Sequence, residues 1–160
     1  MDDLFATSLA EDQHRRCAVG LFNGVWTLMD QGKRTKHEDE TMIHAAHAAR
    51  WHWSVVGKPV NWARSEWQIS RVYAILGKGD QARFHAERYL ELCDEHDLGE
   101  FDRAFAHEAI ARAAAITGDS DDVAGHVQYG LAAAGHVEDE KERDWVLRNL
   151  GTVTREPPPA

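Results

Sequence analysis

The stretch from Glu66 to Asp94, EWQISRVYAILGKGDQARFHAERYLELCD, decides the fold class of this chain. On both sides of Gly77 its apolar and small residues recur every three or four positions, which is the spacing of one face of an α-helix. Before the glycine these positions are Ile69, Tyr73 and Leu76, in register with Trp62 just upstream, and after it they are Ala82, Ala86, Tyr89 and Cys93. Glu66 takes the place of an apolar residue on this face, where a buried carboxylate must find a partner or shift its pKa. Alternating β-strand patterns are absent. The stretch therefore predicts two helices that meet at a turn near Gly77.

The remainder of the chain is divided in the same way. Pro59 is the only proline before the terminal Pro157, Pro158 and Pro159, so long helices meet no interior breaker. Six glycines occur at roughly helical intervals, each where a helix can end in the left-handed conformation: Gly32, Gly57, Gly77, Gly99, Gly118 and Gly135. We therefore expect an all-α fold of about seven helices. Their expected ranges are roughly 8–31, 36–56, 60–76, 80–96, 101–117, 121–134 and 138–149.

Helix-start signals agree with these ends. Thr35 and Glu38 have the spacing of a capping box, in which each side chain satisfies a free backbone amide of the other residue. Pro59 suits a first helical turn. Asp80, and either Asp119 or Ser120, supply oxygens that can cap the helices that follow them.

The stretch 66–94 resembles a tetratricopeptide repeat. The residues that carry the resemblance are Ser70, Tyr73, Gly77, Ala82 and Ala86. Residues 101–130 resemble a weaker second copy, offset by 41 residues from Gly77 to Gly118 where the family has about 34. The resemblance implies antiparallel helical hairpins stacked as a short α-solenoid, with a concave groove that such proteins commonly offer to peptides or protein partners. It carries over no catalytic residues.

Composition limits the function classes. The 160 residues are 43% hydrophobic and carry a net charge of −9, which fits one globular domain, expected over residues 1–154, and disfavours nucleic acid and anionic membranes as partners. We expect the proline-rich residues 155–160 to be extended or disordered. No apolar run is long enough for a signal peptide or a membrane span. Two cysteines without a CxxC pair favour a cytoplasmic location.

Two pairs of residues are interpreted as structural. Glu108 and Arg112 stand four residues apart and are most simply an intrahelical ion pair, worth a few tenths of a kcal/mol. Cys17 and Cys93 lie in segments with apolar helical periodicity, where thiols usually serve packing.

The ten histidines suggest a metal site as one hypothesis. Glu40, His44 and His47 fall on one helical face, and antiparallel hairpins would place His85 at a similar height. The predicted ligands, for a transition metal such as zinc, are His44, His47, His85 and Glu66, with Glu40 as another carboxylate. The alternative is that these histidines are structural and donate single hydrogen bonds.

A group of tryptophans marks a second candidate site. Trp51, Trp53, Trp62 and Trp67 lie within 17 residues across one helix turn. Such a group fills the space between stacked hairpins or lines a recognition groove. The residues predicted for the groove are Trp51, His52, Trp62, Glu66, Trp67, Tyr73 and His85.

Three functional hypotheses follow from these patterns. The leading hypothesis is a non-enzymatic helical-repeat scaffold that binds a protein or peptide partner, or a small ligand, in this groove. The alternative is a metal-binding protein or metal-dependent enzyme that uses His44, His47 and His85 with Glu40 or Glu66. The third is a homodimer that pairs its alanine-rich helix faces.

Overall fold

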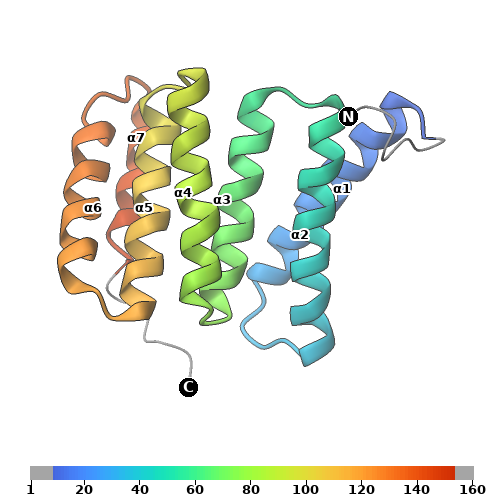
Figure 1. The fold of residues 1–160 in the computed structure, drawn as a ribbon, viewed down its shortest axis with the longest axis horizontal. Coiled ribbons are helices and arrows are strands. Elements are labelled where there is room, and N and C mark those ends of the chain that lie inside the picture. The colour runs from blue at the N-terminus through green and yellow to red at the C-terminus, as the bar shows by residue number, and fades with distance from the viewer. Residues whose placement is uncertain (1–8, 154–160) are drawn as a thin grey trace.

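The computed structural model describes residues 9–153. Within this range the chain forms seven α-helices and no strand, so the all-α prediction is confirmed (Figure 1). The helices are α1 (Glu11–Met29), α2 (Lys36–Val56), α3 (Pro59–Ile75), α4 (Gly79–His96), α5 (Glu100–Thr117), α6 (Ser120–Ala134) and α7 (Glu140–Leu150). The expectation for residues 155–160 lies outside the described residues. No helix between residues 9 and 153 combines the length and apolar character needed to cross a membrane.

Side-chain caps set the starts of several helices. The hydroxyl of Thr35 accepts a hydrogen bond from the Glu38 amide at 3.3 Å, and a Glu38 carboxylate oxygen accepts one from the Thr35 amide at 2.7 Å. This is the predicted capping box. Asp119 caps α6 as predicted. The Asp139 carboxylate accepts the Glu142 amide at 2.9 Å, which is why α7 begins at Glu140 and not at residue 138 as expected.

The glycines end helices in two different ways. Gly77 and Gly118 have positive φ at the ends of α3 and α5, as predicted. Gly99 has positive φ but does not end a helix, and Gly32, Gly57 and Gly135 do not have positive φ. The expectation for those last three was wrong. Gly57 has an extended backbone. A larger residue does not fit there, because a Cβ would lie 2.6 Å from the Trp53 carbonyl oxygen. Helix α4 ends on Asp97 in the left-handed conformation, and Gly99 instead precedes α5.

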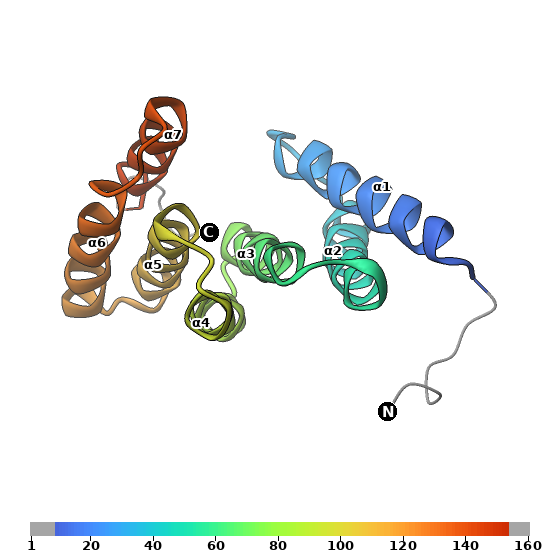
Figure 2. The ribbon, with the colours of Figure 1, turned by 90° about the horizontal axis from the view of Figure 1, so that it is seen from above.

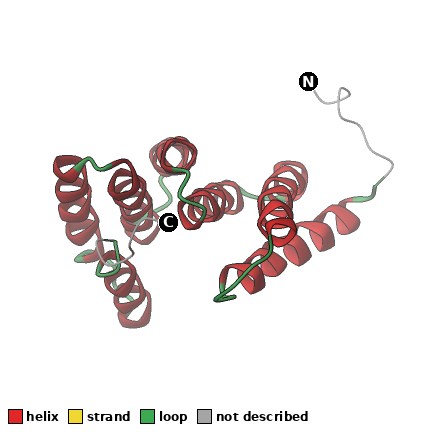
Figure 3. Ribbon diagram, turned by 90° about the horizontal axis from the view of Figure 1, so that it is seen from below, coloured by secondary structure: helices red, strands yellow, loops and turns green. Residues whose placement is uncertain are grey.

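Consecutive helices run antiparallel, and each packs against the next (Figure 1). The odd-numbered helices also contact one another, α1 with α3, α3 with α5 and α5 with α7, so they form one layer. Seen from above, α1 and α7 lie on the same side of the middle helices, and the view from below shows the same bend (Figures 2 and 3). The stacked hairpin arrangement therefore curves, with a concave side between α1 and α7. The tetratricopeptide resemblance itself remains a prediction.

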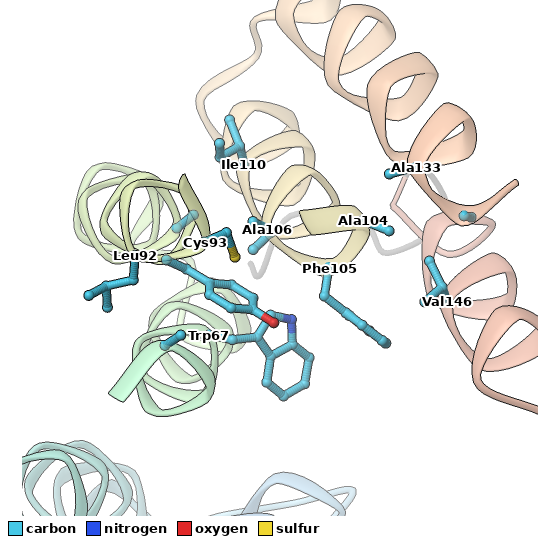
Figure 4. Close-up of a cluster of buried hydrophobic side chains, with 14 of the residues drawn as sticks. Trp67, Leu92, Cys93, Ala104, Phe105, Ala106, Ile110, Ala133 and Val146 are labelled. Carbon is cyan, nitrogen blue, oxygen red and sulfur yellow. The ribbon is translucent and has the colours of Figure 1, made fainter. Parts of the chain in front are cut away.

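The main core cluster is centred on α5. It includes Trp67 from α3, Leu92 and Cys93 from α4, and Phe105 and Ile110 from α5 (Figure 4). Small side chains make close packing possible, and six of the seven alanines of α5 are buried within the chain: Ala104, Ala106, Ala109, Ala111, Ala113 and Ala114. This face of α5 is therefore covered within the chain, and the pairing of alanine-rich faces in a homodimer stays a prediction. A second cluster joins α1, α2 and α3.

The predicted intrahelical ion pair between Glu108 and Arg112 forms, but it is buried and belongs to a larger hydrogen-bond network. The Glu108 side chain is completely buried, and that of Arg112 is only 4% exposed. The Glu108 carboxylate also accepts hydrogen bonds from the Trp67 indole at 3.2 Å and from Arg71 at 3.4 Å. Local spacing revealed the pair but not its burial, because burial depends on α3 and α7 packing over α5.

Candidate functional site

A cavity of about 460 Å³ lies between α1, α3, α5 and α7, the helices that border the concave side of the array. Its volume falls within the roughly 300–1,000 Å³ of typical ligand sites. The lining residues are Phe22 and Trp26 of α1, Arg64 and Trp67 of α3, Tyr89 of α4, Phe101 and Phe105 of α5, and Glu142 and Trp145 of α7. All four odd-numbered helices therefore contribute to this site, which we call the aromatic cavity.

Helical spacing explains why each odd-numbered helix contributes two side chains. Phe22 and Trp26 are four residues apart, as are Phe101 and Phe105, and the pairs on α3 and α7 are three apart. Residues three or four apart share one helical face. Each odd-numbered helix therefore turns two neighbouring side chains toward the concave side.

The aromatic rings form two groups that meet at the floor of the cavity. Trp26 stacks on Trp67 with ring centroids 5.4 Å apart and an interplanar angle of 29°. On the other side, Phe105 contacts Phe101 and Trp145, each at 5.1 Å. Trp67 meets Phe105 edge to face at 5.7 Å, and both rings reach into the space between α3 and α5 (Figure 4). Trp67 and Phe105 are buried, whereas Trp145 is 43% exposed, so they form the floor and Trp145 forms part of the rim.

A buried carboxylate, that of Asp102, accepts hydrogen bonds from two polar side chains that line the aromatic cavity. Asp102, whose side chain is 3% exposed, accepts two hydrogen bonds from the Arg64 guanidinium at 2.8 and 3.0 Å. It also accepts one from the Tyr89 hydroxyl at 2.7 Å. Burial, followed by the Asp102 charge, raises the pKa of Tyr89 well above its ordinary value, so this phenol remains a donor. The Arg64 guanidinium also lies over the Phe101 ring, 5.3 Å from its centroid.

The predicted groove residues are distributed over several places. Of the seven, Trp67 alone lines the aromatic cavity. Trp51 contacts His14 and His52, with ring centroids 5.4 and 5.0 Å away. The Trp62 indole donates to the Trp53 carbonyl at 2.8 Å.

The remaining three predicted groove residues, Glu66, Tyr73 and His85, belong to a polar cluster between α2, α3 and α4. Glu66 accepts hydrogen bonds from Arg50 at 2.8 Å and from His85 at 2.7 Å. His85 stacks on Tyr73 with centroids 5.8 Å apart, and the Tyr73 hydroxyl lies 3.1 Å from His47 Nε2. Burial opposes ionisation of Glu66, but the hydrogen bond from His85 and the Arg50 charge outweigh it and lower the Glu66 pKa.

This polar cluster brings together three of the four predicted metal ligands. His47 and His85 have ring centroids 5.2 Å apart, and His85 binds Glu66 directly. His44 makes no hydrogen bond or ring contact with them. Across residues 9–153, no three histidine, cysteine or acidic side chains are placed to hold one metal ion. In this arrangement Glu66 is an acceptor for Arg50 and His85.

Two further histidine pairs join neighbouring helices. The Nδ1 atoms of His14 and His52 are 2.9 Å apart, and those of His107 and His126 are 3.0 Å apart. One Nδ1 of each pair must donate and the other accept, which two protonated rings cannot do. Burial, and then the proximity of His126, lower the pKa of His107 from 6.5 to about 4.

We expect the His107 pair to destabilise the fold in mild acid. As the pH falls from 7 to 4, the unfolded chain binds a proton at residue 107 that the folded protein does not, so the free energy of unfolding falls. Allowing for partial exposure, this contribution is about 1–2 kcal/mol. His107→Asn keeps a hydrogen-bonding group near the position of Nδ1. It should remove this acid-dependent loss of unfolding free energy, measured by urea unfolding at pH 7, 5.5 and 4. The exposed His136→Asn is the control, and equal pH slopes in both variants would contradict the assignment.

Sequence reasoning missed most of the aromatic cavity. The one local signal was the aromatic spacing on α1 and α5, Phe22 with Trp26 and Phe101 with Phe105. Comparisons with protein-family models, with curated proteins and with solved structures found no match to this chain.

Proposed function

We propose that this protein is a non-enzymatic, tetratricopeptide-like scaffold that binds a segment of a partner protein in the aromatic cavity. The single observation that carries the proposal is a cavity of about 460 Å³ into which five helices turn aromatic side chains. Its ionisable groups are Arg64, Tyr89 and Glu142, and the first two are engaged with Asp102. The lining is suited to burying an apolar or stacking side chain.

The type of residue in the lining supports binding to another protein. Tryptophan, tyrosine and arginine dominate the energetics of protein interfaces, because they bury large rigid surfaces and keep a polar group. Trp26, Trp67, Trp145, Tyr89 and Arg64 supply these types in one site. Two free cysteines, Cys17 and Cys93, support placing this scaffold in the reducing cytoplasm.

Selection from a random peptide library on the immobilised protein, followed by calorimetry on synthesised peptides, tests the proposal. We expect Trp145→Ala to weaken binding by about 30-fold, the effect of removing a hot-spot side chain worth about 2 kcal/mol. Because Trp145 is 43% exposed, this change should leave the fold intact, which circular dichroism checks. Phe84→Ala is the matched control, since Phe84 is an aromatic residue on α4 that is 67% exposed and outside the lining.

Two results would refute the proposal. One is a library from which no peptide with measurable affinity emerges. The other is a set of peptides that bind Trp145→Ala as tightly as the unchanged protein, which would place the contact elsewhere on the surface.

A further inference from the structure

The two charges in the lining of the aromatic cavity are not equally compensated. The Arg64 guanidinium holds the Asp102 carboxylate through two hydrogen bonds, so this pair is neutral as a unit. Glu142 lies on the exposed side of α7, and among the described residues its carboxylate forms no hydrogen bond or ion pair. Its negative charge contributes to the raised pKa of Arg64. The uncompensated charge of the cavity is therefore negative.

Like the negative charge of Glu142, the aromatic ring faces in the cavity favour a positively charged ligand. A cation is attracted to the face of an aromatic ring, most strongly to that of tryptophan. The cavity already contains one such contact, with Arg64 over Phe101 at 5.3 Å. Trp145 stands three residues from Glu142 on the same face of α7, so a ring and a carboxylate are presented side by side.

From this charge balance we propose that the aromatic cavity receives an arginine side chain from a basic segment of the partner protein. The inference rests on the proposed function above and specifies the chemistry of its ligand. Arginine fits better than lysine, because a planar guanidinium can stack on an indole and pair with a carboxylate at the same time. The net charge of −9 favours a basic segment over an acidic one and would speed its encounter with the protein.

The test compares two short capped peptides that are identical except at the centre, where one has arginine and the other has the neutral isostere citrulline. Leucines flank the central residue in both. We expect the arginine peptide to bind about tenfold more tightly by calorimetry, and its affinity to fall as salt is raised. Glu142→Gln should remove most of this preference. Glu140→Gln removes the same charge from the same helix turn outside the lining, so it should keep the preference.

The outcomes separate this inference from the proposed function. If the citrulline peptide binds as tightly as the arginine peptide, or if Glu140→Gln and Glu142→Gln behave alike, the inference fails while peptide binding stands. The same holds if neutral or acidic library peptides bind through Trp145 and the arginine peptide does not. If free arginine amide binds as tightly as the peptide, the cavity binds a small cation, and the proposal of a partner protein segment is overturned. If no peptide binds, both proposals fail together.

Discussion

Glu108→Leu is expected to lower the free energy of unfolding by about 3–5 kcal/mol, because it removes a fully buried carboxylate that accepts hydrogen bonds from Arg112, Arg71 and Trp67. The Arg112 guanidinium lies 2.6 and 2.7 Å from one Glu108 oxygen. Its other hydrogen-bond acceptors include the Asn149 carbonyl and the Thr152 hydroxyl, which are neutral. Equilibrium unfolding in urea measures the effect, with circular dichroism as the signal.

The matched control is Glu87→Leu. Glu87 also pairs with an arginine four residues away, Arg83, but its side chain is 50% exposed. Exposed pairs of this kind contribute about 0–1 kcal/mol. A loss in Glu108→Leu no larger than that in Glu87→Leu would show that the buried network does not stabilise the fold.

A double variant tests the physical reason for the Glu108 effect. Glu108→Leu combined with Arg112→Met removes both charges and keeps side chains of similar size. If the cost of Glu108→Leu comes from the loss of the ion pair with Arg112, the double variant should be more stable than the single one. If the double variant is less stable still, the two side chains contribute through packing more than through their charges.

Local signals were sufficient for the helices. The Thr35 capping box and the Asp119 cap depend on residues within four positions of each other, so their spacing alone predicted where α2 and α6 begin. Glu66 interrupts an apolar helical face, and this position correctly marked it as a buried carboxylate. Its partners Arg50 and His85 lie 16 and 19 residues away, and contact with them depends on how α2 and α4 rotate against α3.

The site depended on information that spacing does not contain. The tryptophans were grouped because they are close in sequence, but successive positions on a helix point in different directions. Trp51 therefore faces His14, whereas Trp67 reaches the cavity. The other walls come from Trp26 and Trp145, which are more than 100 residues apart in the sequence and line one cavity because the helix array curves (Figure 2). Curvature is the sum of small angles between neighbouring helices, and no single motif encodes it.

Trp67 belongs both to the core and to the aromatic cavity, and Trp67→Ala is expected to cost about 3–5 kcal/mol, the usual range for truncating a buried aromatic residue. The indole is 7% exposed, stacks on Trp26 and meets Phe105. Its N–H donates to the buried Glu108 carboxylate. Urea unfolding should show the loss, and Phe84→Ala should stay within about 0.5 kcal/mol of the unchanged protein.

Trp67→Phe separates the two contributions of this side chain. It keeps an aromatic ring against Trp26 and Phe105 but removes the indole donor, so we expect a cost of about 1.5–3 kcal/mol, the range for a hydrogen bond to a charged group. A cost for Trp67→Phe equal to that of Trp67→Ala would mean that the hydrogen bond to Glu108, and not the packing, accounts for the stability. The distinction matters for binding. If packing dominates, Trp67→Phe remains folded with an aromatic floor, and loss of peptide binding in Trp67→Ala then reports a damaged core as much as a missing contact.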